Sequence, residues 1–351
     1  MKAVVFERFG GPEVLTYGQR PAPEVGPGQV LVRVRACGVN HLDLWVRGGL
    51  PGLEPEMPHI LGNDIVGEIV AVGTGVPQAH DVAGVTHVAV GERTLVNPTL
   101  SCGTCPACAN GDDNLCRSYD VIGRKRNGGY AEYVAVPAAN CLAFPARLSW
   151  EQAAAVPLVF LTAWHMLVTR ARLRPGEDVL VIGAGSGVGS AAVQIARLHG
   201  ARVIATAGNE AKLARARELG AHELIDHTRE EIAPRVRELT TRKGVDVVVE
   251  HVGGRVFEAG VAALARDGRL VTCGATTGGK VTLDLNLLFG RHLTLLGSWM
   301  GRRSDMNDVL RHVASGALEP VVDSVLPLAD ARRAHERIES RAHFGKVVLV
   351  P

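Results

Sequence analysis

The glycine-rich segment at residues 183–189 constrains the fold of this chain more than any other feature. It reads Gly-Ala-Gly-Ser-Gly-Val-Gly and stands between an apolar strand pattern at 178–182 and a helical pattern at 190–199. Glycines in such a turn let the backbone approach a pyrophosphate, whose charge is stabilised at the N-terminus of the helix. We therefore predict a dinucleotide site, with a turn that binds no ligand as the alternative. Its expected contacts are Gly185, Ser186, Gly187, Val188 and Gly189.

Strand and helix patterns alternate beyond this turn. Strand patterns at 202–206, 245–250 and 269–273 are separated by helical patterns at 211–219 and 256–264. This alternation predicts an α/β unit with a parallel, doubly wound sheet. Gly274 follows the last of these strands and is a further expected cofactor contact.

The preceding part of the chain, residues 1 to about 150, has a different texture. Valine-rich runs at 30–34, 65–72, 94–97 and 130–136 are separated by glycine and proline clusters. This pattern predicts a β-rich region. At the other end of the chain, an amphipathic segment at 305–313 and a last strand at 346–350 follow the α/β unit.

The choice between the two nicotinamide cofactors depends on the end of the second strand of the α/β unit. An Asp or Glu there would bind the ribose 2′-hydroxyl of NAD. The sequence at 205–210 is Ala-Thr-Ala-Gly-Asn-Glu, and Lys212 follows. A missing carboxylate and a nearby cation suit a 2′-phosphate, so we predict NADP(H), with Gly208 and Lys212 as contacts. Glu210 leaves NAD as the alternative, because a shifted strand end would bring it to the ribose.

Four cysteines, Cys102, Cys105, Cys108 and Cys116, lie within a stretch of fifteen residues. Thiolates with two residues between them can converge on one tetrahedral ion, and four of them leave no position for water or substrate. We therefore predict one structural zinc that folds a lobe at about 98–119. An iron–sulfur cluster or two disulfides are the alternatives. The remaining cysteines are isolated among apolar residues and are expected to be buried: Cys37, Cys141 and Cys273.

Composition excludes several classes of function. The chain has 351 residues, of which 46% are hydrophobic, and a net charge of +2 without a basic stripe, so we expect no nucleic-acid partner. The longest apolar stretch, at 153–168, is interrupted by Pro157, Thr162 and His165 and falls short of the ~20 residues of a membrane span. The N-terminus has no signal-peptide pattern, and clustered cysteines suit a reducing compartment, so we expect a cytoplasmic location.

These motifs together resemble the medium-chain dehydrogenase/reductase superfamily. The resemblance includes Met-Lys-Ala-Val-Val at 1–5, Gly-Val-Asn-His-Leu-Asp at 38–43, the cysteine lobe, the glycine-rich turn and Phe-Gly-Lys-Val-Val at 344–348. It implies a GroES-like β-rich catalytic domain at 1–157, a Rossmann domain at 158–295 and a return to the catalytic domain at 296–351. It also implies an active site between the domains and a homo-dimer or homo-tetramer. In relatives a phosphate-contacting Tyr often stands where this chain has His227, which is a weaker cofactor contact.

The resemblance also bears on the chemistry. Zinc alcohol dehydrogenases of this superfamily hold a second, catalytic zinc, and its three protein ligands are replaced here by Asn40, Asn63 and Leu158. The chain therefore looks like the quinone oxidoreductase and enoyl reductase branch, close to acryloyl-CoA-type reductases. Asn40 is expected near the nicotinamide, Thr162 near the nicotinamide or its phosphate, and His59 in the cleft wall or on a backbone carbonyl.

We therefore expect an NADPH-dependent reductase of a small molecule, without a catalytic zinc. Its acceptor would be an activated C=C bond (in an enone, enal or enoyl thioester) or a quinone. A zinc-type alcohol dehydrogenase or carbonyl reductase is the alternative, and a non-catalytic NADPH-binding protein is the second alternative. The chain also differs from the family by extra residues between 76 and 90, which include His80 and His87 and predict a surface or cleft-lining loop.

Overall fold

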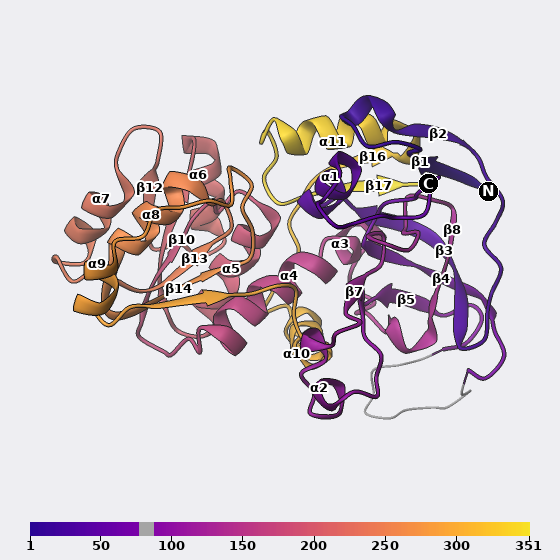
Figure 1. The fold of residues 1–351 in the computed structure, drawn as a ribbon, viewed down its shortest axis with the longest axis horizontal. Helices are drawn as coiled ribbons and strands as arrows, with labels where there is room; N and C mark the ends of the chain where they lie inside the picture. Colours follow the sequence, from indigo (N-terminus) through magenta and orange to yellow (C-terminus); the bar gives the residue numbers. More distant parts are fainter. Residues whose placement is uncertain (77–87) are drawn as a thin grey trace. The chain divides into compact units, whose positions relative to one another are not determined.

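The computed structural model describes residues 1–76 and 88–351. The expected loop with His80 and His87 lies outside these residues. The described chain forms two compact units, drawn in Figure 1. One consists of Met1–Leu158 and Arg302–Pro351, and the other of Val159–Gly301. The chain thus leaves the first unit once and returns to it once.

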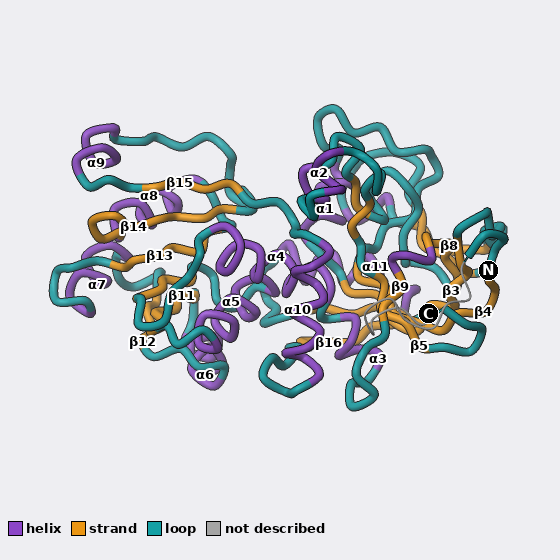
Figure 2. Tube along the Cα trace, turned by 90° about the horizontal axis from the view of Figure 1, so that it is seen from below, coloured by secondary structure: helices purple, strands orange, loops and turns teal. Residues whose placement is uncertain are grey.

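The unit at Val159–Gly301 contains a six-stranded sheet in the order β12-β11-β10-β13-β14-β15. All five pairings are parallel, which confirms the predicted parallel sheet. In Figure 2 these strands lie one beside the next. Their bounds are β10 (Asp178–Val181), β11 (Arg202–Ala207), β12 (Glu223–Asp226), β13 (Val245–Glu250), β14 (Leu264–Thr272) and β15 (Thr294–Gly297).

Helices connect these strands. The first of them, α4, begins at Pro157, just before the chain enters this unit. The helices are α4 (Pro157–Trp164), the π-helical turn η4 (His165–Arg170), α5 (Gly187–Leu198), α6 (Glu210–Glu218), α7 (Ile232–Leu239), α8 (Gly254–Ala263) and α9 (Leu285–Gly290). The sequence did not predict β12, α7 or β15. In the structure, β15 completes the sheet, and the chain then returns to the first unit at Arg302.

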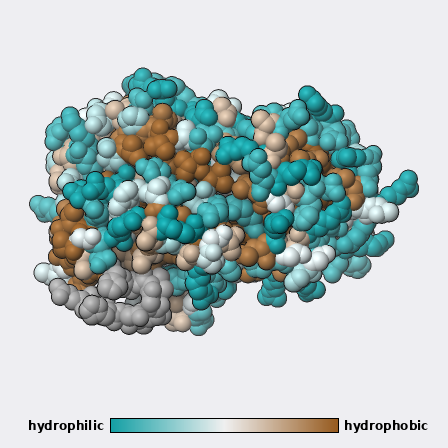
Figure 3. All heavy atoms as spheres, turned by 180° about the vertical axis from the view of Figure 1, so that it is seen from behind, coloured by the Kyte–Doolittle hydropathy of each residue, from teal (hydrophilic) through white to brown (hydrophobic). Residues whose placement is uncertain are grey.

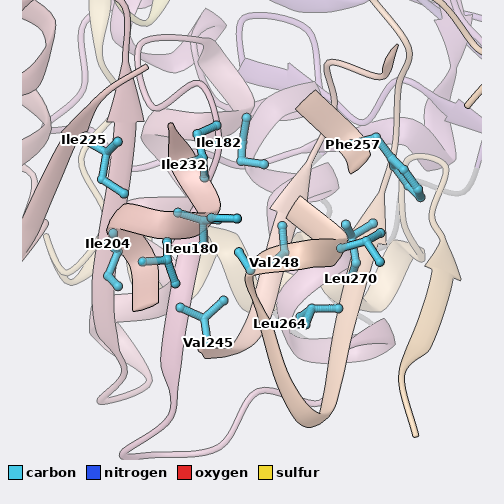
Figure 4. Packing of buried hydrophobic residues seen from close by; sticks show 14 of the residues in the cluster. Leu180, Ile182, Ile204, Ile225, Ile232, Val245, Val248, Phe257, Leu264 and Leu270 are labelled. Atoms are coloured by element: carbon cyan, nitrogen blue, oxygen red, sulfur yellow. The ribbon is translucent and has the colours of Figure 1, made fainter. Parts of the chain in front are cut away.

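The core of this unit lies between the sheet and its helices. Leu180 and Val248 from neighbouring strands, and Ile232 and Phe257 from helices, belong to one buried cluster, shown in Figure 4. Strands that are buried on both faces need continuous apolar sequence. This is why 178–182 and 245–250 could be recognised as strands without an alternating pattern.

The other unit is built on a seven-stranded sheet around β3 (Gln29–Gly38). Antiparallel partners pair with β3 along both edges, β4 (Asp64–Val72) and β8 (Tyr133–Pro137). At its C-terminal end β3 also pairs with β17 (Lys346–Val350). The further strands are β5 (Arg93–Val96), β9 (Cys141–Leu142) and β16 (Val322–Pro327) in this sheet, and the small pairs β1 (Lys2–Val5) with β2 (Thr16–Gln19) and β6 (Thr99–Leu100) with β7 (Asp120–Val121).

Short helices complete this unit. The helices are α1 (His41–Gly48), α2 (Pro106–Ala109), α3 (Trp150–Ala154), α10 (Arg303–Ala314) and α11 (Ala331–Glu339), with 3-10 turns η1 (Pro12–Val14), η2 (Asp113–Leu115), η3 (Ala138–Asn140) and η5 (Leu328–Asp330). In α1 the Asp43 carboxylate accepts a hydrogen bond from the Asn40 backbone N–H at 2.8 Å and so satisfies one donor at the start of the helix.

On the face shown in Figure 3, hydrophilic side chains predominate, and apolar side chains gather in separate patches. In the part of the chain that the structure describes, no helix combines the length and the apolar character needed to cross a bilayer.

Candidate functional site

The predicted dinucleotide turn joins β10 to α5. Ser186 is the N-cap residue of α5, and its Oγ accepts a hydrogen bond from the Gly189 backbone N–H at 2.8 Å. A Cβ at Gly189 would lie 2.2 Å from the Gly183 carbonyl oxygen, so only glycine allows the helix to pack this closely on the turn. The turn thus has the close packing that the predicted pyrophosphate site requires, at the N-terminus of a twelve-residue helix.

The region that would distinguish NAD from NADP lies at the carboxyl end of β11. Asn209 caps α6 by accepting the Lys212 backbone N–H at 2.9 Å, so Lys212 lies in the first turn of that helix. A Cβ at Gly208 would lie 3.3 Å from Nε2 of His227, which places this histidine beside Gly208. The structure therefore brings the two expected contacts Gly208 and His227 together, with Lys212 one helical turn away. Glu210 is the first residue of α6.

A buried carboxylate organises the carboxyl ends of the neighbouring strands β13 and β14. Glu250, at the end of β13, accepts the Gly253 backbone N–H at 2.6 Å and the Thr272 hydroxyl at 2.8 Å. The Thr272 hydroxyl also lies 3.2 Å from the carbonyl oxygen of Gly274. Glu250 was not predicted as a site residue. A glutamate that ends a continuously apolar strand was the available signal.

The Thr162 side chain lies in α4 and is almost fully buried. Its Oγ lies 3.9 Å from the sulfur of Met300, and both residues belong to the second unit. His59 belongs to the first unit, where its Nε2 donates to the Gly123 carbonyl oxygen at 3.1 Å. Burial lowers the pKa of His59. The ring thus binds a backbone carbonyl, which is one of the two roles expected for His59 from the sequence.

The Asn40 side chain lies in a polar cluster with Asp64 and Lys346, and all three residues are at most 5% exposed. Asn40 Nδ2 donates to Asp64 Oδ2 at 2.9 Å. Lys346 Nζ donates to the same carboxylate oxygen at 2.8 Å, to the Val39 carbonyl oxygen at 2.7 Å, and to Asn40 Oδ1. The sheet register brings these residues together, because β3 pairs here with both β4 and β17.

The residues around Asn40 do not fit a catalytic metal. The Leu158 backbone N–H donates to Asp64 Oδ1 at 2.7 Å, and Asn63 Nδ2 donates to the Ile122 carbonyl oxygen at 2.7 Å. A leucine offers no ligand atom, and a neutral amide is a weak ligand for zinc compared with thiolate, imidazole or carboxylate. The Asp64 carboxylate is already paired with the Lys346 ammonium.

A second buried chain of hydrogen bonds begins at Asp43, which has no exposed surface. Its carboxylate accepts the backbone N–H of Asn40 at 2.8 Å and of Gly62 at 3.0 Å, and the Tyr130 hydroxyl at 3.2 Å. Burial raises the pKa of Asp43 to about 7, although the two backbone donors act in the opposite direction.

His335 on α11 continues this chain from the other side of Tyr130. Arg47 donates to His335 Nδ1 at 2.9 Å. Because a guanidinium can only donate, Nδ1 is unprotonated, so Nε2 carries the hydrogen and donates to the Tyr130 hydroxyl at 3.2 Å. Burial, and then the charge of Arg47, lower the pKa of His335 to about 3. The chain of donors therefore runs in one direction, from Arg47 through His335 and Tyr130 to Asp43.

The four predicted metal ligands converge. Within the described chain, the ligand atoms of Cys102, Cys105, Cys108 and Cys116 all lie within 4.8 Å of one another. Cys105 and Cys108 have their sulfurs 3.5 Å apart, and Cys102 and Cys108 have theirs 3.9 Å apart. Tetrahedral thiolates at 2.3 Å from zinc would be about 3.8 Å apart. All seven cysteines are free, Cys37 and Cys141 are buried, and Cys273 is partly buried. The arrangement fits one four-coordinate metal.

Sequence reasoning missed Lys346, Tyr130 and His335. Lys346 was quoted only as part of a family motif. An isolated Lys, Tyr or His gives no signal of its own, because its partners are more than eighty residues away in the sequence.

Comparisons with known proteins agree with this architecture. The family of the alcohol dehydrogenase GroES-like domain matches residues 26–146, and the zinc-binding dehydrogenase family matches residues 187–315. The GroES-like and Rossmann expectations are thereby confirmed.

Full-length relatives include enzymes of two kinds. An NAD-dependent alcohol dehydrogenase of Sulfolobus acidocaldarius is 34% identical over 99% of both chains. The quinone oxidoreductase of Rattus norvegicus is 31% identical over 100% of this chain and 98% of its own. A crystal structure of an NAD-dependent alcohol dehydrogenase superposes with a TM-score of 0.94 at 48% identity, with both chains fully covered. The chain belongs to the medium-chain dehydrogenase/reductase superfamily of oxidoreductases.

Proposed function

We propose that this oxidoreductase uses NADPH to reduce an activated C=C bond, in an enone, enal or enoyl thioester, or a quinone. The observation that carries the proposal is the cluster of Asn40, Asp64 and Lys346, where the Asp64 carboxylate is paired with an internal ammonium and Asn40 offers only an amide to a metal. When bound, NADPH supplies the hydride. Conjugate reduction suits such a site, because the developing negative charge spreads into an enolate and needs only hydrogen-bond donors.

Asn40 is the proposed donor to the substrate oxygen on which this charge develops. Its Nδ2 has two hydrogens, and the cluster uses one of them for Asp64. In the second unit, Thr162, expected near the nicotinamide, and Glu250, through the backbone of Gly253, are proposed to shape the cofactor site. His59 is proposed to support the wall of the site through its bond to Gly123.

NADP(H) is the proposed cofactor. Its support is the end of β11, where Gly208 and Asn209 replace a carboxylate and Lys212 lies in the first turn of the next helix. Ser186 and Gly189, with the N-terminus of α5, are proposed to hold the pyrophosphate, and His227 and Gly274 to line the site further along.

We further propose one structural zinc in the four-cysteine site and a cytoplasmic location, where these thiols stay reduced. A homo-dimer or homo-tetramer is proposed from the edge of the six-stranded sheet. β15 is an edge strand of this sheet. The segments before and after it in the sequence carry large apolar side chains with high exposed fractions: 62% for Leu285, 67% for Phe289 and 44% for Trp299. Exposed apolar surface beside an open strand edge favours pairing with another chain.

Carbonyl or alcohol redox chemistry is the second candidate. It is favoured by the 48% identity to an NAD-dependent alcohol dehydrogenase of known structure. This chemistry is disfavoured by the side chains of Asn40, Asn63 and Leu158, which do not suit a catalytic metal. An alkoxide would then form without a metal to stabilise it.

The deciding experiment is the product formed from trans-2-hexenal and NADPH, since this substrate offers both a C=C and a C=O bond. Hexanal supports the proposal, and 2-hexen-1-ol supports the second candidate. Metal analysis provides an independent measure, with one zinc per chain expected and two expected for a zinc alcohol dehydrogenase. Tight NADPH binding without turnover of hexenal or benzoquinone would instead indicate a nucleotide-binding protein without catalysis.

A further inference from the structure

The Asn40 amide lies between one group that can only donate and one that, when ionised, can only accept. Lys346 Nζ faces Asn40 Oδ1, and Asp64 Oδ2 faces Asn40 Nδ2 at 2.9 Å. An ammonium has three donors and no acceptor, and an ionised carboxylate has no donor. The two ends of an amide have nearly the same shape, so its orientation depends on its partners. Here both partners require the same orientation.

The ion pair that flanks Asn40 is itself fixed. Asp64 Oδ1 is held by the Leu158 backbone N–H at 2.7 Å, while its Oδ2 accepts from Lys346 at 2.8 Å. The third hydrogen of Lys346 is bound by the Val39 carbonyl oxygen at 2.7 Å. The Lys346 ammonium therefore has no hydrogen left for a substrate, and it can act there only through Asn40.

We propose that Lys346 and Asp64 are positioning residues that fix the orientation of the Asn40 amide, so that its second Nδ2 hydrogen is held as a donor for the substrate oxygen. This inference rests on the proposed role of Asn40 in the reduction. It explains why a buried ion pair is kept at this place although well-packed neutral side chains of similar size are often as stable.

Neutralising the pair should reverse the amide. In the double variant Lys346→Met/Asp64→Asn, the new amide at position 64 keeps its oxygen on the Leu158 N–H and turns its nitrogen towards Asn40. Asn40 then accepts through Oδ1 where it previously donated. The double variant leaves no unpaired buried charge, so its stability is restored, whereas Lys346→Met alone leaves the Asp64 charge without its partner.

The test compares these variants with the wild type in melting temperature and in the reduction of trans-2-hexenal. We expect the melting temperature of the double variant to return close to that of the wild type. We expect its kcat to stay about 100-fold lower, the order of loss for one oriented donor at a developing charge, with KM for NADPH unchanged. A double variant that recovers both stability and kcat would show that the pair only balances charge, and would overturn the proposal.

A matched control changes another ion pair that touches the same part of the chain. Asp323 accepts from Arg337 Nε at 2.6 Å and from the Phe344 backbone N–H at 2.9 Å, close to Lys346 in sequence. The variant Arg337→Met/Asp323→Asn should therefore disturb the start of β17 to a similar degree. We expect this variant to keep the wild-type kcat, because the ion pair that it removes does not face the Asn40 amide.

The orientation is also measured without turnover, by NMR of protein labelled with ¹⁵N-asparagine and without substrate. The Asn40 resonances are identified by their loss in Asn40→Ala. In the wild type we expect one Nδ2 hydrogen shifted downfield and protected from exchange by Asp64, and in the double variant we expect this signature to disappear. An unchanged signature would overturn the inference even if hexenal is reduced. Lack of hexenal reduction by the wild type would count against the proposed function and leave this measurement valid.

Discussion

The Asp113 carboxylate accepts a hydrogen bond from the backbone N–H of Arg303 at 3.1 Å. This contact joins the loop between Cys108 and Cys116 to the first residue of α10, where the chain has just returned from the second unit. The neighbouring Asp112 pairs with the guanidinium of Arg302. Carboxylates at the N-terminus of a helix are favourable because they satisfy its free N–H groups and its positive end. The cysteine loop therefore caps α10.

Removal of the proposed structural zinc is expected to loosen α10 as well as the cysteine lobe. Without an ion, nothing links the four sulfurs to one another, and the loop that carries Asp112 and Asp113 loses its fixed geometry. Treatment with a chelator should lower the melting temperature by about 5 °C or more, because a loss of about 2 kcal/mol corresponds to roughly 4–8 °C in a domain of 150–250 residues. Hydrogen exchange should become faster in the amides at 303–306.

A control variant separates the cap from the metal. Asp113→Asn keeps all four cysteines, and it should speed exchange at the start of α10 without loss of zinc. If chelation accelerates exchange only within 98–119 and leaves 303–306 protected, the coupling between the lobe and α10 is refuted.

Asp43 makes stability depend on pH. Its pKa is raised by burial to about 7, whereas in the unfolded chain it is near 3.8. Between these values the folded state holds a proton that the unfolded state has lost, so this group stabilises the fold most below pH 4, and its contribution is lost as the pH rises to 7. The difference in unfolding free energy between the wild type and Asp43→Asn should fall by up to about 1.4 kcal/mol per pH unit in this window. Urea unfolding at several pH values measures it.

His335 provides an opposite test in the same hydrogen-bond chain. Its pKa is lowered to about 3, below the usual 6.5, so its contribution to stability grows as the pH rises through this window. The difference between the wild type and His335→Gln should therefore increase with pH from 3 to 6.5. Slopes of the same sign for the two variants would contradict the opposite pKa shifts of Asp43 and His335.

Continuous apolar strands were the part of the fold that sequence could predict well. The predicted strand at 245–250 and the final strand at 346–350 coincide with β13 and β17. β12 (Glu223–Asp226) and β15 (Thr294–Gly297) were missed, because four-residue edge strands contain too few apolar residues for a clear pattern. Their formation depends on the neighbouring strand, a tertiary contact that a local pattern does not contain.

Sites made from neighbouring residues were also predictable. The Gly-rich turn and the four cysteines are local in sequence, and the structure brings each set together. The cluster around Asn40 was only partly predictable, because Lys346 reaches it through the register of β17 against β3. Nothing in the sequence near Lys346 indicates that its ammonium is buried.

Gly189→Ala is expected to damage the cofactor site. The new Cβ would lie 2.2 Å from the Gly183 carbonyl oxygen and 2.8 Å from Ala184 Cα, both backbone atoms that cannot turn aside. The turn must then open, and NADPH affinity should fall about tenfold or more, the loss expected for about 1.4 kcal/mol of misplaced binding contacts. Fluorescence titration with NADPH measures this loss. Gly290→Ala, at the end of α9 with nothing within 4 Å of the added Cβ, is the matched control. Equal affinities of the two variants would contradict the close packing of α5 on the turn.

Lys212→Ala is expected to distinguish the two nicotinamide cofactors. Lys212 lies in the first turn of α6, directly after the residues that would meet the adenosine ribose. Loss of a charge-assisted hydrogen bond to a 2′-phosphate costs about 1.5–3 kcal/mol, so NADPH affinity should fall roughly 10- to 100-fold while NADH affinity changes little. Calorimetric titration with both nucleotides gives the comparison. Arg217→Ala, which removes an exposed cation further along the same helix, should change neither affinity.

If the wild type binds NADH more tightly and Glu210→Ala weakens the binding of NADH, the first residue of α6 contacts the ribose and the cofactor is NAD(H). Such a result would correct the cofactor without touching the orientation of Asn40, which depends on groups of the other unit.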